Sequence, residues 1–154
     1  MKKLFILIII MTVSSAILFT GCKKEEEEET PPTSTNILTA QIDGIAFSAT
    51  MPLAQMALGI IQISGSNSAG SIQILLDYQV TTETVNVTDN TEEAIYWSSG
   101  QDSYWPGTGT IIVTNHDVVN NIIEGTFTAS LEEFSTSAVV SVTNGVFNVT
   151  YIEQ

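Results

Sequence analysis

The sequence has one cysteine, Cys22, one histidine, His116, and no lysine or arginine after residue 24. A single cysteine cannot form a disulfide within the chain, and one histidine without a second cysteine cannot complete a zinc or copper site. The four basic residues are Lys2, Lys3, Lys23 and Lys24, and the formal net charge is -13 at pH 7. From residue 25 onward, with His116 neutral, all the charged side chains at pH 7 are therefore acidic.

This lack of basic side chains excludes several functions. Binding to nucleic acid depends on lysine and arginine at phosphate groups, and clamps for phosphate or carboxylate use the same two residues. Schiff-base chemistry needs a lysine. An acidic surface is also repelled by anionic lipid headgroups. We predict no nucleic-acid partner, and any attachment to a membrane must come from outside the acidic region.

The N-terminus has the features of a secretion signal. Lys2 and Lys3 precede an apolar stretch, Leu4–Phe19, that is interrupted only by one threonine and two serines. A positive start followed by a short apolar segment is typical of a signal peptide. The alternative is a transmembrane anchor, which needs about 20 apolar residues. The stretch is slightly short for that and ends at small residues and charges.

The end of this stretch, Leu18-Phe19-Thr20-Gly21-Cys22, resembles the lipobox of bacterial lipoproteins. Gly21 fits the pattern, whereas Phe19 and Thr20 depart from its usual leucine and small residue. The resemblance implies that residues 1–21 are removed and that Cys22 becomes a fatty-acylated first residue. At about 0.8 kcal/mol per buried CH₂, two or three acyl chains hold a protein on a bilayer almost permanently.

Residues 22–36 form a charged segment rich in proline, threonine and serine, with the acidic run Glu25–Glu29. Such a composition cannot bury apolar surface, so we predict a disordered tether. An acidic run after the lipidated cysteine resembles the surface-export signal of Bacteroidota lipoproteins, although Lys23 and Lys24 depart from its simplest form. We expect a lipid-anchored outer-membrane protein at the cell surface, with the periplasmic face as the alternative.

The remaining residues, Ile37–Gln154, suffice for one domain. Apolar and polar residues alternate, for example at Ile72, Ile74 and Leu76 and again at Phe127, Ala129 and Leu131. This period of two predicts β-strands. We predict an all-β fold, an antiparallel β-sandwich of about eight to ten strands, with a closed β-barrel as the alternative. Met51–Leu58 fits either a strand or a short helix.

Two dipeptides predict tight hairpins. Asp43-Gly44 would pair Ile42 with Ile45, Ala40 with Phe47 and Leu38 with Ala49, with all six on one apolar face. Asn144-Gly145 would pair Val142 with Phe147, Val140 with Val149 and Ala138 with Tyr151.

The first of these hairpins lies in a segment, Leu38–Ala49, that resembles the opening of an all-β domain of unknown function in small Bacteroidota lipoproteins. In that family an AxxDGxxFxA hairpin follows the tether. Gly109–Thr114, Glu124–Phe127 and Thr143–Val149 resemble its later landmarks. The resemblance spans the domain and implies its fold and location. Its motifs are turns and strand ends, so it supplies no catalytic residue.

Polar candidates for chemistry are few. We expect His116 to be an exposed histidine in the Asn115–Asn121 turn, and we predict no catalytic residue, no metal site and no cofactor. Calcium is the one ion that the oxygen-rich segments Asp89–Glu93 and Asn115–Asn121 favour, although neither has the spacing of a twelve-residue calcium loop. A pair of carboxylates acting as a small glycoside hydrolase is the enzymatic alternative.

Four aromatic residues are the best indication of a binding site. Tyr96, Trp97, Tyr104 and Trp105 flank a polar turn that contains Asp102. Such a cluster can stack on a glycan or a peptide, or alternate members can fill the core. We therefore expect a non-enzymatic binding domain for a glycan or an envelope protein, with a structural envelope subunit as the alternative.

Replacing Cys22 by serine removes the thiol that would receive the diacylglyceryl group. We expect Cys22→Ser to abolish metabolic labelling with an alkynyl fatty acid and to leave the unprocessed precursor. The measurement is in-gel detection of the label together with intact mass. A variant that still takes up the label would refute lipidation at this residue.

Overall fold

The structure is a computed structural model that describes residues 36–89, 91–133 and 135–154. The predicted signal peptide, the lipobox Leu18–Gly21, Cys22 and the tether up to residue 35 lie outside these ranges. The described residues belong to one compact unit. No helix among the described residues is long and apolar enough to cross a membrane.

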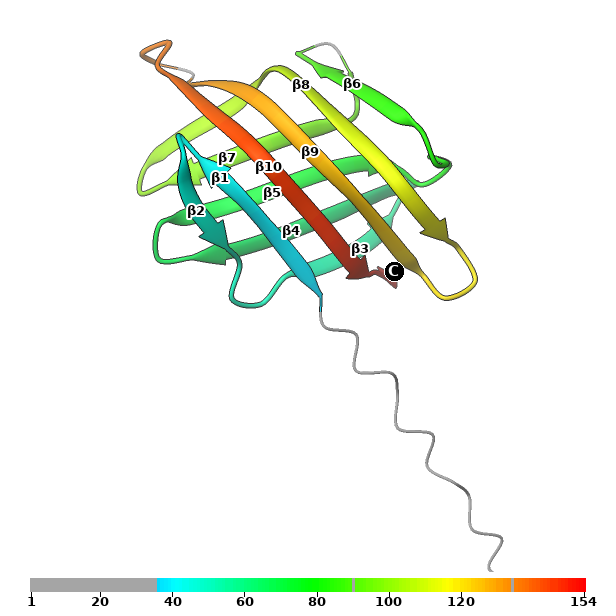
Figure 1. The fold of residues 1–154 in the computed structure, drawn as a ribbon. Helices are drawn as coiled ribbons and strands as arrows, with labels where there is room; N and C mark the ends of the chain where they lie inside the picture. The colour runs from blue at the N-terminus through cyan, green and yellow to red at the C-terminus, as the bar shows by residue number, and fades with distance from the viewer. Residues whose placement is uncertain (1–35, 90, 134) are drawn as a thin grey trace, which may run out of the picture. The chain divides into compact units, whose positions relative to one another are not determined.

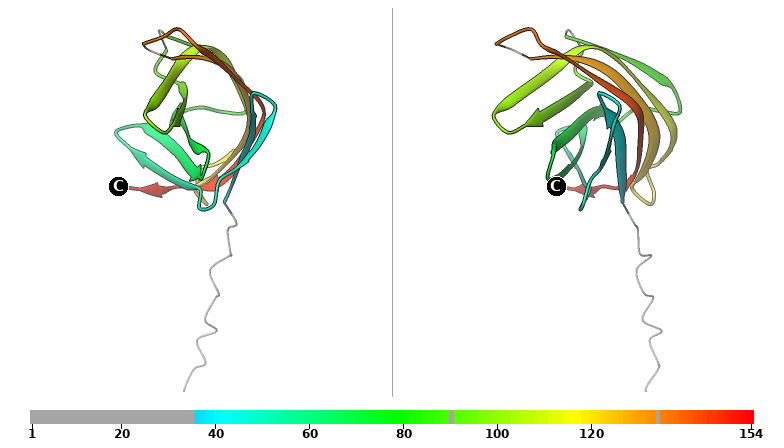
Figure 2. Two further views of the ribbon diagram at one scale, coloured as in Figure 1. Left: turned by 90° about the vertical axis from the view of Figure 1, so that its left-hand side faces the viewer. Right: turned by 60° about the vertical axis from the view of Figure 1, so that its left-hand side comes forward.

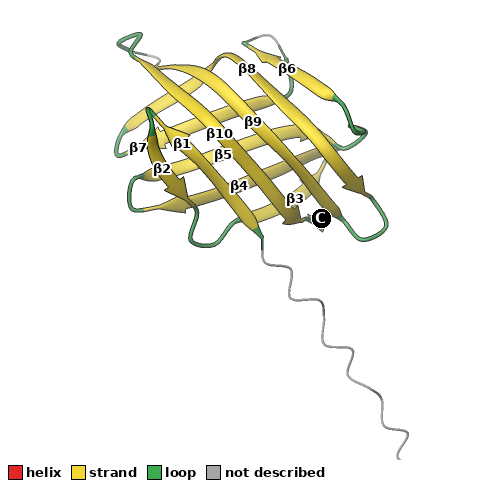
Figure 3. Cartoon of the chain, viewed as in Figure 1, coloured by secondary structure: helices red, strands yellow, loops and turns green. Residues whose placement is uncertain are grey.

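Strands and short turns make up the described part of the chain (Figure 3). The strands are β1 (Ile37–Ile42), β2 (Ile45–Ser48), β3 (Leu53–Ala57), β4 (Ile60–Asn67), β5 (Gly70–Asp77), β6 (Thr84–Thr88), β7 (Ala94–Ser99), β8 (Asp102–Asp117), β9 (Ile122–Glu133), β10 (Val139–Thr150) and β11 (Ile152–Glu153). The all-β class is confirmed, and the ambiguous segment Met51–Leu58 contains a strand, β3.

All these strands belong to one sheet, in the order β11-β3-β4-β5-β7-β8-β9-β10-β1-β2, with β6 paired to β8. Neighbours are antiparallel except β11 and β3, which are parallel. In Figure 1, strands β8, β9, β10 and β1 cross in front of β3, β4, β5 and β7. The two further views show that the sheet curls into a half-barrel (Figure 2). The two expected layers are thus two halves of one curled sheet.

Strand β8 joins these two halves. Its first residues pair with β7, where Tyr104 lies opposite Trp97, and most of its length pairs with β9. Its register with β9 shifts between Pro106 and Thr108 and again between Val113 and Asn115. Bulges of this kind bend a strand and increase its twist. A long, bent strand is therefore what allows one sheet to supply both layers.

The core lies between the two halves and is entirely apolar among the described residues. The predicted alternation is confirmed, since Ile72, Ile74 and Leu76 are buried on β5 while their neighbours are only half-buried. Residues from β9 and β10 face them across the core, including Phe127 and Phe147. Burial of one such side chain stabilises the fold by about 1.5–3 kcal/mol, so the inner faces of the two halves hold the domain together.

The first predicted hairpin is confirmed. Ile42 pairs with Ile45 and Ala40 with Phe47, and the Ala49 amide donates a hydrogen bond to the Leu38 carbonyl at 3.0 Å. Asp43 and Gly44 both have positive φ, 50° and 80°, as the tight hairpin requires. One expected core contact is absent, because the Ile45 side chain is 72% exposed.

The second predicted hairpin is wrong. Asn144 and Gly145 lie inside the continuous strand β10, which pairs with β9 on one side and β1 on the other. The expected pairs Val142 with Phe147, Val140 with Val149 and Ala138 with Tyr151 do not form; Val142 instead lies opposite Ala129, and Phe147 opposite Gly125. Asn144 has a φ of 51° and marks a bulge between Val142 and Gly145.

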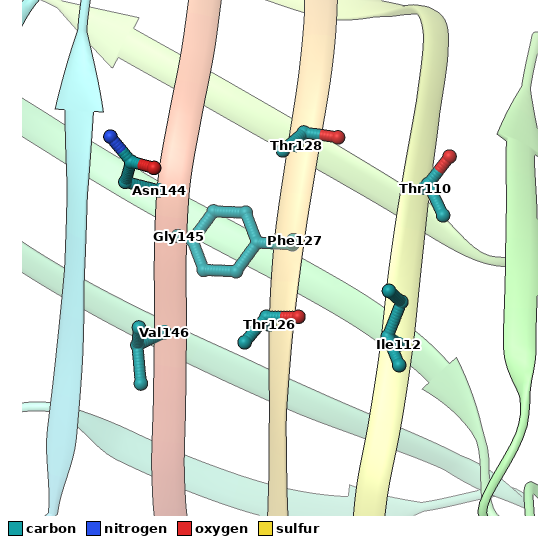
Figure 4. A pocket seen from close by; sticks show the side chains of 8 residues that line it. All are labelled: Thr110, Ile112, Thr126, Phe127, Thr128, Asn144, Gly145 and Val146. Carbon is teal, nitrogen blue, oxygen red and sulfur yellow. The ribbon is translucent and has the colours of Figure 1, made fainter.

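Gly145 is needed here because an aromatic ring covers it. A Cβ at Gly145 would lie 2.6 Å from ring atoms of Phe127, which is directly opposite on β9. Figure 4 shows the ring of Phe127 reaching from β9 across to Gly145. The neighbouring pair repeats the arrangement with the roles reversed, since a Cβ at Gly125 would lie 2.5 Å from Phe147. Each glycine makes room for the phenylalanine of the facing strand.

Carboxylates stabilise the turns in place of ion pairs. Asp43 accepts a hydrogen bond from the Ser141 amide at 2.8 Å, Asp77 one from Gln79 at 2.6 Å, and Asp117 one from Val119 at 3.0 Å. Hydrogen bonds from backbone amides to ionised carboxylates are stronger than neutral ones. A domain without lysine or arginine thus uses its acidic groups to satisfy its own backbone.

We expect Gly145→Ala to destabilise the domain by about 1–3 kcal/mol, because the added methyl group overpacks the core against Phe127. Urea unfolding of residues 33–154, followed by tryptophan fluorescence, measures the change. Thr126→Ala, on the exposed face of β9, is the control and should change stability by less than about 0.5 kcal/mol. Equal stability of Gly145→Ala and the parent would contradict the packing of Phe127 on Gly145.

Candidate functional site

One end of the half-barrel is filled by aromatic side chains. Tyr78 follows the end of β5, His116 lies near the end of β8 and Tyr151 follows β10. Their rings pack edge to face, with centroids 5.9 Å apart for Tyr78 and His116 and 5.8 Å for His116 and Tyr151. We call this group the aromatic plug. It closes the end of the molecule where these strands finish.

The expectation that His116 is an exposed turn residue is wrong. It belongs to β8, which extends further than predicted, and it is half-buried. Its Nδ1 lies 2.8 Å from the Val80 carbonyl oxygen and its Nε2 lies 3.1 Å from the Tyr151 hydroxyl. A carbonyl only accepts, so Nδ1 carries a proton and donates to Val80. Nε2 thus joins His116 to Tyr151 within the plug, and Nδ1 joins it to the chain that follows β5.

The opposite end of the half-barrel is open. There the β1–β2 turn, the β4–β5 turn, the β7–β8 turn and the start of β10 come together, on the left of Figure 1. Residues from these segments line a cleft of about 290 Å³. We call it the mouth cleft. It is lined by Ile42, Asp43, Ile45, Ala46, Phe47, Ala69, Trp97, Ser99, Asp102, Tyr104 and Val140. A cleft of this size suits a side chain or a small ligand.

The floor of the mouth cleft is aromatic and rigid. Phe47 and Trp97 are buried and pack edge to face, with ring centroids 5.4 Å apart and an interplanar angle of 90°. Tyr104 lies opposite Trp97 on the next strand and is half-buried against the core. Edge-to-face pairs of this kind stabilise a structure by about 0.5–1.5 kcal/mol beyond their buried area. The cleft is therefore preformed.

Polar groups gather at the rim of the mouth cleft. Asp43 and Asp102 contribute carboxylates, and Ser99 donates a hydrogen bond to the Ala69 carbonyl at 2.9 Å. With no lysine or arginine in the described part of the chain, no cation balances the two carboxylates. The arrangement favours a ligand that combines an apolar group with a positive charge or hydrogen-bond donors.

The four aromatic residues singled out in the sequence separate onto two faces. Trp97 and Tyr104 point into the mouth cleft, whereas Tyr96 and Trp105 lie on the outside of the sheet, since neighbouring residues on a strand face opposite sides. Tyr96 and Trp105 pack edge to face at 5.5 Å, and Trp105 is 53% exposed. The structure thus brings them together as two pairs.

Beside Trp105 lies a second hollow of about 380 Å³, which we call the outer hollow. It is lined by Asp89, Trp105, Pro106, Gly107, Glu132, Glu133 and Ser137. The Ser135 and Thr136 hydroxyls and backbone amides bond to Glu133 and lower the pKa of its carboxyl to about 2. A general acid for glycoside hydrolysis needs a raised pKa. Glu133 is therefore unsuited to that role.

A third hollow, of about 340 Å³, lies on the outer face of β8, β9 and β10 (Figure 4). It is lined by Thr110, Ile112, Thr126, Phe127, Thr128, Asn144, Gly145 and Val146, and none of these side chains titrates. Within the described ranges, no three His, Cys, Asp or Glu side chains are grouped to hold a metal ion. Calcium binding stays a prediction from composition.

Sequence reasoning missed most of the mouth cleft. The predicted hairpin contains Ile42, Asp43 and Phe47, and the sequence indicated only a structural role for them. Phe47 meets Trp97 only because β2 and β7 belong to facing halves of the curled sheet, and Ile42 and Asp43 line the same cleft. The sequence did contain one signal for the cleft. Tyr96 and Trp97 are consecutive, as are Tyr104 and Trp105, so on strands each pair places one ring on either face of the sheet.

These features define an all-β domain with one curled sheet, a plugged end and an open cleft. The chain belongs to the family described as a domain of unknown function (DUF6252), whose family model matches residues 34–150. The match confirms that a domain of unknown function spans the β domain. Comparison with curated proteins and with solved structures gives no match.

The plug predicts a loss of stability at high pH. Burial, and then the neighbouring Tyr78 and Glu153, raise the pKa of the Tyr151 hydroxyl from 10.0 to about 12. The folded state thus favours the neutral form of Tyr151. The stability that this hydroxyl contributes is complete below pH 10 and is lost as the pH rises through 12. We expect the free energy of unfolding to fall by up to about 2 kcal/mol over this interval.

Urea unfolding at a series of pH values measures this loss. Tyr151→Phe should be about 1 kcal/mol less stable than the parent at pH values below 10, because the hydrogen bond to His116 is lost. Its further loss at higher pH should be smaller than that of the parent. Tyr96→Phe, on the outer face, is the control. Parallel curves for the parent and Tyr151→Phe would contradict the assignment.

Proposed function

We propose that this chain is a lipid-anchored outer-membrane lipoprotein whose β domain binds a ligand in the mouth cleft without acting as an enzyme. The observation that carries the proposal is the preformed aromatic floor beneath two rim carboxylates. Pockets with an apolar floor and a few convergent polar groups are the usual form of binding sites, including those in the mouths of barrels.

The charge distribution supports the anchor. An acidic domain without basic side chains has no attraction for anionic headgroups, so acyl chains on Cys22 are the part of the protein suited to hold it at a bilayer. We place the domain at the cell surface, in accord with the acidic run Glu25–Glu29, with the periplasmic face as the alternative location.

The ligand class follows from the cleft. Ile45 and Tyr104 offer apolar surface above the buried rings of Phe47 and Trp97. Asp43 and Asp102 favour a nearby positive charge. A basic peptide segment that carries an aromatic or aliphatic side chain has both features. An envelope protein with such a segment is therefore the partner we favour, and anionic ligands are disfavoured by the same two carboxylates.

Three dansyl compounds of nearly equal size but different charge test this proposal: N-dansylethylenediamine (an amine), dansylglycinamide (neutral) and dansylglycine (an acid). Residues 33–154 with Trp105→Phe retain Trp97 as the one tryptophan. We expect saturable energy transfer from Trp97 to bound dansyl groups. The amine should bind at least about tenfold more tightly than the acid, since each charge contact is worth roughly 1 kcal/mol.

Asp43→Asn with Asp102→Asn should remove the preference for the amine, and asparagine tolerates the positive φ at position 43. Glu124→Gln with Glu153→Gln, near the plugged end, is the control with the same change in net charge and should keep the preference. Absence of saturable transfer, or equal binding of the acid and the amine, would overturn the proposal.

A further inference from the structure

We propose that the outer hollow is a second binding site and that it binds a neutral glycan. The hollow lies on the opposite face of the sheet from the mouth cleft, and its aromatic residue is Trp105 rather than Trp97. The inference therefore rests on a different surface from the function proposed above, and either can fail without the other.

Trp105 supplies the stacking surface. Its side chain is 53% exposed, and the edge-to-face contact with Tyr96 at 5.5 Å and 86° holds its orientation. The face of an indole ring carries partial negative charge, which attracts the slightly positive C–H groups on the flat side of a pyranose. An exposed ring held by a neighbouring ring loses little side-chain entropy when a sugar stacks on it.

Glu132 lies beside this ring. It is directly opposite Trp105 in the β8–β9 register, and a Cβ added at Gly107 would lie 3.4 Å from its Oε1 atom. The carboxylate is therefore folded over Gly107, at the place where the register shifts between Pro106 and Thr108. A carboxylate accepts two hydrogen bonds from adjacent hydroxyls, and such charge-assisted bonds are strong.

The charge of the hollow selects against acidic sugars. Asp89, Glu132 and Glu133 all line it, and the described part of the chain contains no lysine or arginine to pair with a uronate, sulfate or phosphate group. An anionic glycan would meet like charges at short range, which costs binding energy. Neutral sugars offer hydroxyl donors to the Glu132 carboxylate, and they are the class that the hollow fits.

Affinity gel electrophoresis tests the proposal with the full chain in a polyoxyethylene detergent, which contains no sugar. The gels carry hydroxyethylcellulose, laminarin or glycogen as neutral polymers, or polygalacturonate as the anionic one. We expect at least one neutral polymer to slow migration and polygalacturonate to leave it unchanged. In Trp97→Phe, where Trp105 is the one tryptophan, a hexasaccharide of the polymer that slows migration should shift the fluorescence emission of Trp105.

Trp105→Ala should abolish the retardation, and Glu132→Gln should weaken it by about tenfold, through loss of hydrogen bonds to a charged acceptor. Ile112→Ala, which removes another exposed apolar side chain of β8 (43% exposed), is the matched control and should bind as the parent does. Asp43→Asn with Asp102→Asn should also bind normally.

Three results would overturn the proposal: no retardation by any neutral polymer, retardation that persists in Trp105→Ala, or equal retardation by polygalacturonate. Loss of dansyl binding at the mouth cleft with glycan binding intact would refute the proposed function alone.

Discussion

The structure depends on one strand being shared by two layers. β8 pairs with β7 at its start and with β9 over most of its length, so both inner faces of the domain belong to one hydrogen-bonded sheet. The sheet curls on itself instead of stacking on a second sheet, and the two ends of the half-barrel that it forms are filled differently. Tyr78, His116 and Tyr151 fill one end, while the other keeps a cleft over Phe47 and Trp97. The position of the cleft is thus a consequence of how the core closes.

The absence of basic side chains shapes both the fold and the surfaces. Aspartates at the turns bond to backbone amides, as Asp43 does with Ser141 and Asp77 with Gln79. The carboxylates at the mouth cleft and the outer hollow have no lysine or arginine nearby in the described sequence. Their charge therefore acts on whatever approaches from outside. Both proposals rest on this charge, one for a cation at a cleft with an apolar floor and the other for hydroxyl groups beside an exposed indole.

Local patterns in the sequence predicted the strands but not the way they assemble. Alternation identified the buried face of β5 because it depends only on neighbouring residues. Asp43-Gly44 and Asn144-Gly145 look alike because a tight turn and a bulge both need a residue with positive φ. What separates them is Phe127, which lies directly opposite Gly145 on another strand. That contact is not local, and neither is the meeting of Phe47 with Trp97, so no reading of the segments alone could supply them.

The two tryptophans show how little sequence separates two sites. Trp97 and Trp105 lie on strands joined by a two-residue turn, yet one is 5% exposed beneath the mouth cleft and the other 53% exposed on the outer face. The strand period sets this difference, because Trp97 lies opposite Tyr104 and Trp105 is the next residue along β8. Because the two rings lie on opposite faces of the sheet, a substitution of one tryptophan does not alter the surface around the other. The same hairpin can therefore contribute to a rigid apolar cleft on one face and to an exposed aromatic surface on the other. Each surface can be altered by substitution while the other is kept.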